Sequence, residues 1–213
     1  MELHGRATAF NVQKVLWLLD ELGLEFAHHP AGGAHGGLDD PAFLVLNPHG
    51  KVPVLVDDGT PIWESHAILR YLAACYGAPT FWPRDPAARS LNDRWMDWAH
   101  TTLQPDFMRL FWGFYRMPEH KRDPGQIERA RRCCERHYRL IDDQLAYRHY
   151  LGGDQFSLAD IPAGTSLYRY LHMGLDVALP ARTADWYARL TQRPAFRNRV
   201  MMRFDDLRGR ESF

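Results

Sequence analysis

The sequence predicts an α/β unit followed by an all-helical part, and three observations lead to this fold class. Residues 1–78 alternate short strand-like segments with helical patterns in the order β-α-β-α-β-β-α. Residues 77–90 hold three prolines and one glycine, which interrupt the regular pattern. Every later regular stretch is helical. We therefore expect one domain at 1–78, a linker at 79–86 and an all-helical domain at 87–213.

The elements of the first part follow from local patterns. Apolar residues at i, i+3, i+4 and i+7 spacing predict a helix that Gly23 ends, and they are Val12, Val15, Leu16, Leu19 and Leu22. The turn signal Asp57-Asp58-Gly59 predicts a hairpin between the last two strands. The strands are expected at 2–5, 25–29, 52–56 and 61–62, and two further helices at 41–46 and 64–76. The β-α-β order makes the first two strands parallel.

The second part contains only helical periodicity. We expect helices over 87–115, 125–148, 157–171 and 182–202. The breaks between them fall at Met117-Pro118, Gly152-Gly153 and Gly174.

The composition excludes several classes of function. The 26 basic and 26 acidic residues balance, which argues against a nucleic-acid or anionic-membrane partner. No apolar run reaches the roughly 18 residues of a membrane helix, and no signal-peptide pattern opens the chain, so we expect a cytoplasmic protein. The three cysteines form no redox or zinc spacing, and the eleven histidines are scattered. We expect no metal.

Two segments of the first part carry candidate binding chemistry. Pro53 follows Val52 at a strand entry, where a cis peptide bond would turn the Val52 backbone outward to pair with a peptide ligand. Glu64-Ser65 enters a helix, where Ser65 and the helix N–H groups suit a carboxylate and Glu64 suits an ammonium group. A proline that only punctuates a loop and an ordinary capped helix are the alternatives.

Taken together, these segments resemble the glutathione transferase superfamily. The K-V-P-V-L strand entry, the E-S pair, the proline-bearing linker and the helical second domain occur in family order. Phe156 to Asp160 resembles the family's structural capping box, in which Ser157 caps a helix and Asp160 reaches back. The segment N-V-Q-K-V-L-W-L-L-D-E-L-G-L is most similar to bacterial theta-like and beta-like members. The resemblance covers essentially the whole chain.

The resemblance implies a thioredoxin-like first domain, glutathione as co-substrate and a homodimer. It places the γ-glutamyl end at Glu64 and Ser65, and the cysteinyl backbone at Val52 beside Pro53. Lys51, with His49, would approach the glycyl carboxylate. A small hydrophobic electrophile would bind between the domains, against a wall for which the candidates are Phe10, Phe111, Trp112 and Tyr115. Each of these four aromatic residues also fits an ordinary core position.

Ala9 departs from the family pattern. Relatives that share N-V-Q-K-V have a serine here, which donates a hydrogen bond to the glutathione thiolate. No tyrosine or cysteine occurs in residues 1–22 to replace it. The remaining donors are Asn11, Thr8, a nearby backbone N–H and the first helix end, and Asn11 is favoured over Thr8, although it could instead cap the helix.

Three functions remain open from the sequence. The first is transfer of glutathione to an electrophile, with activity weakened by Ala9. The second is glutathione-dependent disulfide reduction that uses Asn11 and Thr8. The third is a non-catalytic protein that binds glutathione without activating it.

Overall fold

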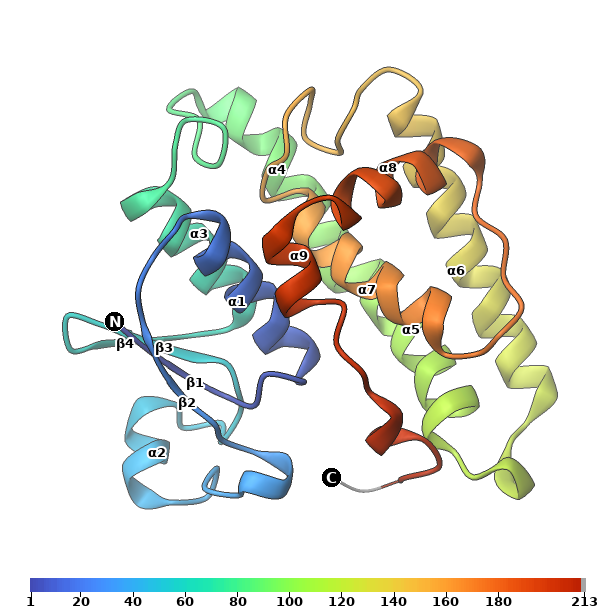
Figure 1. Ribbon diagram of the computed structural model, residues 1–213, viewed down its shortest axis with the longest axis horizontal. Coiled ribbons are helices and arrows are strands. Elements are labelled where there is room, and N and C mark those ends of the chain that lie inside the picture. The colour runs from blue at the N-terminus through green and yellow to red at the C-terminus, as the bar shows by residue number, and fades with distance from the viewer. Residues whose placement is uncertain (212–213) are drawn as a thin grey trace.

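The computed structural model describes residues 1–211 as two packed layers of different composition. A four-stranded sheet with its helices lies on one side, and a bundle of helices lies on the other (Figure 1). The strand order is β2-β1-β3-β4. β1 and β2 are parallel, as predicted, and the other two pairings are antiparallel. The strands span Glu2–His4 (β1), Ala27–His29 (β2), Val54–Asp57 (β3) and Thr60–Trp63 (β4).

The helix α1, Phe10–Glu21, connects the two layers. It packs against α3 (Ser65–Tyr76) on the sheet side and against α7 (Asp160–His172) and α9 (Pro194–Arg199) on the bundle side. This double contact explains why nine of its twelve residues are buried, many more than one apolar stripe would require. Gly23, with φ of 64°, follows the end of α1 as predicted. The short helix α2 spans Pro41–Leu46, the predicted range.

The bundle contains the predicted helices with one correction. The range 182–202 forms two helices, α8 (Ala181–Thr191) and α9, because Pro194 occupies the first position of α9 and cannot continue a preceding helix. The other bundle helices are α4 (Pro86–Trp98), α5 (Gln104–Leu110) and α6 (Pro124–Leu145). Within residues 1–211, no helix has both the length and the apolar character needed to cross a membrane.

The helix that begins at Pro86 runs on to Arg116, but it widens twice into π-helical turns. These segments, Ala99–Leu103 and Phe111–Arg116, flank α5. Pro105 lacks the N–H that would bond the carbonyl four residues earlier, which accounts for the first of them. Insertions of this kind often accompany functional sites.

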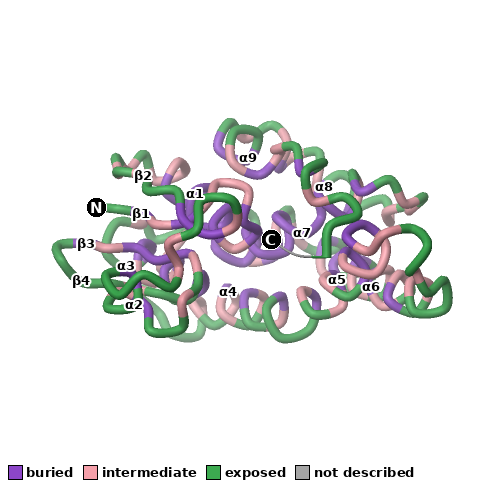
Figure 2. The backbone as a smooth tube through the Cα atoms, turned by 90° about the horizontal axis from the view of Figure 1, so that it is seen from below, coloured by how far each residue is buried: buried purple, intermediate pink, exposed green. Residues whose placement is uncertain are grey.

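Ion pairs and a shared core hold the two layers together. Glu21 accepts two hydrogen bonds from Arg193, at 2.7 and 2.6 Å, and Asp20 pairs with Arg199 at 2.7 and 3.0 Å. Seen from below, the buried stretches of α1 and α7 lie next to each other at the centre of the molecule (Figure 2), and the two helices are in contact. One hydrophobic cluster includes Trp17 of α1 and Phe196 of α9, whose rings contact edge to face at 4.8 Å. Both polar and apolar contacts therefore cross the junction.

The capping box is confirmed at the start of α7. Asp160 Oδ2 accepts a hydrogen bond from the Ser157 N–H at 3.0 Å, and Ser157 Oγ accepts one from the Ala159 N–H at 3.3 Å. Asp160 Oδ1 also accepts from the Leu151 N–H at 3.0 Å and from Trp186 Nε1 at 2.9 Å. One buried carboxylate thus joins a loop, a helix start and α8.

Candidate active site

The loop before β3 presents backbone toward a cavity. The Val52-Pro53 peptide bond is cis, as predicted. The buried Asn47 holds this loop, because its Nδ2 donates to the Lys51 carbonyl at 2.8 Å and its Oδ1 accepts from the His49 N–H at 3.1 Å. Within residues 1–211, neither the N–H nor the C=O of Val52 has a hydrogen-bond partner. An extended peptide can therefore pair with this residue.

The start of α3 closes the same cavity from the other side. Glu64 precedes the helix with φ of 68°, a conformation uncommon for a residue other than glycine. Ser65 is the first helical residue and no side chain caps the helix, so the alternative of an ordinary capped helix is wrong. The consequence is that the first N–H groups of a twelve-residue helix remain available to an anion.

Together these segments enclose a cavity of about 280 Å³. It is lined by Asn11, Asn47, Lys51, Val52, Pro53, Glu64, Ser65 and His100. Five of the six residues predicted to bind glutathione thus surround one space. The exception is His49, which is not in the wall; its ring instead contacts Trp63 at 5.1 Å.

A second cavity of about 310 Å³ adjoins the first and shares Asn11, Lys51 and Val52 with it. Thr8, Ala9, Phe10 and Phe111 also line it. Two of the four predicted wall residues, Phe10 and Phe111, therefore lie in the wall of this cavity. Trp112 lines a different cavity of the bundle, and Tyr115 is 1% exposed in the core, with its ring stacked on Phe111 at 5.2 Å. Side chains of the π-helical turn point in different directions, so Phe111 faces this cavity whereas Trp112 and Tyr115 do not.

Asn11 stands where the two cavities meet, and a buried lysine sets its orientation. Lys14 Nζ donates to Asn11 Oδ1 at 3.0 Å and to Gln104 Oε1 at 2.7 Å. An ammonium group only donates, so the amide oxygen must face Lys14 and Nδ2 must face the other way. Within residues 1–211, Asn11 Nδ2 has no hydrogen-bond partner. The alternative that Asn11 caps α1 is wrong, because the residue lies inside the helix and Ala9 occupies the cap position.

The surroundings of Lys14 are unusual for a lysine. The side chain is fully buried, and burial lowers its pKa from 10.5 to about 7, against the opposing effect of the Glu64 carboxylate. Its Nζ lies 3.3 Å from Nε2 of His66, whose pKa is lowered to about 2 by burial, then by Lys14, His100 and Arg70. His66 is therefore a neutral neighbour, and the site places one titratable cation beside Asn11.

Three residues at the site, Lys14, His100 and the cavity-lining Arg169, carry no signal in the sequence that marks them as site residues. Lys14 lies between apolar positions of a helical pattern, where a lysine is normally solvent-exposed. Its burial results from the contact of α1 with the bundle, because Gln104 comes from α5. Arg169 reaches the site from α7, 161 residues along the chain from Thr8, whose carbonyl oxygen it contacts at 2.6 Å.

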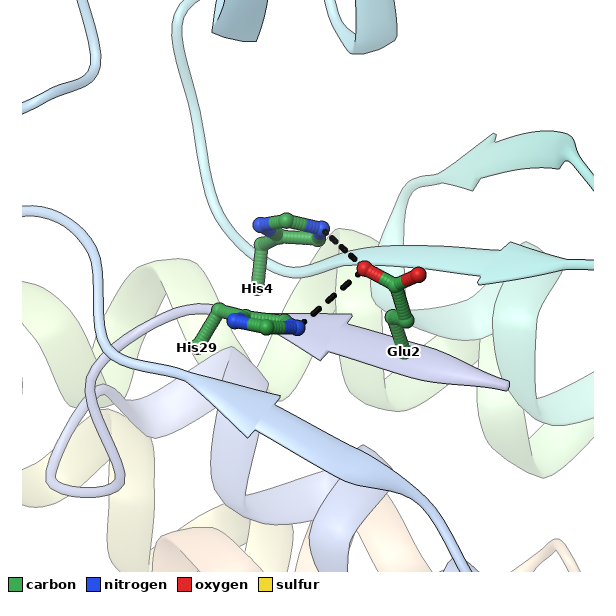
Figure 3. A group of neighbouring side chains, drawn as sticks. All are labelled: Glu2, His4 and His29. Atoms are coloured by element: carbon green, nitrogen blue, oxygen red, sulfur yellow. Dashed lines mark ion pairs between the residues drawn. The ribbon is translucent and has the colours of Figure 1, made fainter.

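One group of metal-ligand residue types lies apart from both cavities (Figure 3). The strand register places His4 beside His29, and Glu2 lies two residues from His4 on the same face. Glu2 Oε2 is 3.1 Å from His29 Nε2 and 3.8 Å from His4 Nε2, and the two imidazoles stack at 4.9 Å. Burial is the main cause that lowers the pKa of His4, followed by His29. The strand pairing brings together histidines that look scattered in the sequence, but none of the three residues lines either cavity.

The fold and the site define a class of protein: a thioredoxin-like α/β domain, with its peptide-pairing loop and helix start, joined to a helical domain that completes a second cavity. Family models support this class over both parts of the chain. "Glutathione S-transferase, N-terminal domain" matches residues 11–75, and "Glutathione S-transferase, C-terminal domain" matches residues 124–197. The chain belongs to the glutathione S-transferase family.

Individual relatives agree over nearly the full length. Glutathione S-transferase GstB of Escherichia coli K12 is 39% identical over 202 residues, which cover 94% of this chain and 97% of the relative. The theta class glutathione S-transferase of Xanthomonas axonopodis pv. citri, solved with glutathione bound, has 42% identity and a TM-score of 0.89, covering 95% of this chain and 97% of that chain. Disulfide-bond oxidoreductase YfcG of Escherichia coli is 28% identical over 87% of each chain.

Proposed function

We propose that this glutathione transferase activates the glutathione thiol through the Asn11 amide, which takes the place of the serine hydroxyl that Ala9 lacks. The observation that carries this proposal is the 3.0 Å contact from Lys14 Nζ to Asn11 Oδ1. It fixes the amide so that Nδ2 is the group available at the junction of the two cavities. Thr8, on the wall of the second cavity, is the subsidiary donor.

The proposed binding mode follows the walls of the first cavity. The γ-glutamyl carboxylate accepts hydrogen bonds from Ser65 and the first N–H groups of α3, and Glu64 receives the ammonium group. The cysteinyl backbone pairs with Val52, and Lys51 meets the glycyl carboxylate. Glutathione bound in this way contacts the first domain, residues 1–78, while Phe10 of that domain and Phe111 of the helical domain, 87–213, form the aromatic wall for the acceptor.

The reaction is attack by the thiolate on an electrophile held in the second cavity. A free thiol, with a pKa of about 8.5, is mostly protonated at neutral pH, so the protein must stabilise the anion. A hydrogen bond to a charged group contributes about 1.5–3 kcal/mol, which corresponds to a fall of about one to two units in the thiol pKa. The positive charge of Lys14 and the N-terminus of α1 act in the same direction.

The test is a titration of the bound thiol. Glutathione affinity is measured by calorimetry, and the pKa of bound glutathione is then followed by the ultraviolet absorbance of the thiolate in the wild type, Asn11→Ala and Thr8→Val. We expect the pKa to rise by about one to two units in Asn11→Ala and by less in Thr8→Val. A wild-type complex that titrates like glutathione in solution would remove the proposed activation, and no measurable binding would remove the function itself.

Disulfide reduction is the second candidate, because the relative YfcG is named as a disulfide-bond oxidoreductase. The same activated thiolate would attack a disulfide sulfur instead of carbon. Turnover of a small glutathione mixed disulfide, compared with turnover of an electrophile under the same conditions, separates the two activities.

We also propose that the protein acts as a homodimer in the cytoplasm. In the family arrangement, the first domain of one subunit meets the early helices of the second domain of its partner. Trp95 and Trp98 lie on α4 among these helices, with their rings in edge-to-face contact at 5.1 Å. Sedimentation velocity at micromolar concentration tests this assembly, and a monomer there would contradict it.

A further inference from the structure

Two histidines and a glutamate share one face of the β1-β2 strand pair, away from both cavities (Figure 3). Glu2 and His4 alternate along β1 with the fully buried Leu3, so they point to the opposite face of the sheet. The parallel register pairs His4 with His29 of β2, which places both rings on that face. Glu2, His4 and His29 are called the strand cluster below.

The strand cluster brings three metal-ligand atoms close together. Glu2 Oε2 lies 3.1 Å from His29 Nε2 and 3.8 Å from His4 Nε2, and all three atoms lie within 4.8 Å of one another. A tetrahedral zinc ion with ligands at about 2.0–2.1 Å holds its ligand atoms about 3.3–3.4 Å apart. The two measured separations lie on either side of this value. The cluster is therefore close to the spacing that a zinc ion requires.

Hydrogen bonds do not account for this arrangement. Within residues 1–211, the ring nitrogens of His4 and His29 take part in no hydrogen bond, and the approach of Glu2 to His29 is an ion-pair contact only. The 3.8 Å between Glu2 and His4 is too long for a hydrogen bond. The neighbouring His28 differs, because its Nε2 lies 2.7 Å from the Gly5 carbonyl oxygen. The nitrogen atoms of the strand cluster thus remain available as ligands.

The cluster combines one supported side chain with two that can move. The side chain of His4 is 19% exposed and its ring contacts Phe43 of α2 edge-on at 6.3 Å, whereas the side chains of Glu2 and His29 are 51% and 48% exposed. Ala27, the register partner of Glu2, is small and leaves room for the carboxylate to reach His29. The stacked rings have lone pairs that run side by side, so His29 must turn for both nitrogens to face one ion. Its exposure permits this turn.

We propose that the strand cluster binds one Zn²⁺ ion through Glu2 Oε2 and the Nε2 atoms of His4 and His29, with water in the fourth position. Two histidines and one glutamate are a donor set of known zinc sites, and imidazole ligands favour Zn²⁺ over Mg²⁺. The bound ion joins β1 to β2, a strand of three residues at the edge of the sheet. It therefore stabilises this edge. The inference is independent of the proposed function.

The first experiment titrates zinc chloride into chelator-treated, tag-free protein by calorimetry, without glutathione, whose thiol also binds zinc. We expect one ion per chain, and an affinity at least about tenfold lower in His4→Gln and in His29→Gln, because even a group that only orients a metal ligand contributes about 10–100-fold. An equal concentration of Mg²⁺ should not compete. His120→Gln is the matched control, since it removes an exposed histidine outside the cluster.

Cys75→Ser is a second control, because its exposed thiol is another possible zinc ligand. Both control variants should bind zinc as the wild type does. Absence of stoichiometric binding, equal affinity in the wild type and both cluster variants, or competition by Mg²⁺ would overturn the proposal. Because no step uses glutathione, these outcomes leave the proposed function to its own test.

The second experiment tests whether the ion joins the two strands. Zinc at about one hundred times its dissociation constant should raise the melting temperature of the wild type by about 5–10 °C, and this rise should be absent in His29→Gln. Hydrogen exchange of the β2 amides, Ala27–His29, should slow in the wild type when zinc is added and stay unchanged in the variant. Zinc binding that altered neither the melting temperature nor this exchange would overturn the proposed link between β1 and β2.

Discussion

Replacing Lys14 by methionine should raise the pKa of bound glutathione, although Lys14 lines neither cavity. The ammonium is 3.0 Å from Asn11 Oδ1. Adding the width of the amide and a hydrogen bond to sulfur places the thiolate about 7 Å from Nζ. At an effective dielectric constant of about 20, this charge pair contributes about 2 kcal/mol, or about 1.5 units of thiol pKa. Near pH 7 Lys14 is about half protonated, so we expect a rise of about one unit.

The assay is the thiolate titration at saturating glutathione, with affinity measured first for each variant. Lys121→Met is the matched control, because it removes one positive charge from an exposed lysine that pairs with Glu211. We expect it to leave the thiol pKa unchanged. If bound glutathione had the same thiol pKa in Lys14→Met as in the wild type, neither the charge of Lys14 nor its hydrogen bond to Asn11 would contribute to activation of the thiol.

The same variant makes a separate prediction about folding. The Lys14 pKa is lowered from 10.5 to about 7, so between these pH values the unfolded chain binds a proton that the folded chain does not. Wild-type stability should therefore rise with pH across this window, by a few kcal/mol in total, and this rise should be absent in Lys14→Met. Below pH 7 the variant should be at least as stable as the wild type, because a buried charge is removed. Denaturant unfolding at several pH values measures both effects. A variant markedly less stable than the wild type at pH 6 would contradict the expectation that burying the lysine charge lowers stability.

Three further predictions concern single residues. Ser65→Ala should weaken glutathione binding about tenfold with little change in stability, because it removes one donor to the γ-glutamyl carboxylate, and unchanged calorimetric affinity would count against this binding mode. Asp160→Ala should lower the free energy of unfolding by more than about 3 kcal/mol, since it leaves buried donors such as Trp186 Nε1 unpaired, and a smaller loss in denaturant titrations would refute that role. Burial lowers the pKa of His66 to about 2 in the folded protein, whereas the unfolded chain takes up a proton near pH 6.5, so the free energy of unfolding should fall by about 2 kcal/mol between pH 7 and pH 5. In His66→Gln the free energy of unfolding should depend less on pH over this range. If it fell as steeply as in the wild type, His66 would not be the cause.

Local sequence patterns were sufficient to predict most of the helices, strands and turns. The apolar spacing in α1, the turn at Asp57-Asp58-Gly59 and the glycine after α1 act over a few residues, so a single sequence contains all the information they need. The one helix predicted too long, 182–202, failed for an equally local reason, the proline at 194. The order of motifs around Pro53 and Glu64 was also sufficient to indicate the family.

Site residues that come together from both layers could be identified only from the tertiary structure. The pattern around Lys14 describes an ordinary helix, and only the approach of Gln104 and His66 makes that lysine a buried cation beside Asn11. The sequence by itself indicated Asn11, the helix start at Ser65 and Ala9 as positions of interest, because each can be recognised from a few neighbouring residues. The packing of α7 against α1 decided that Arg169 reaches the second cavity, because side chains distant in the sequence meet only when two helices pack.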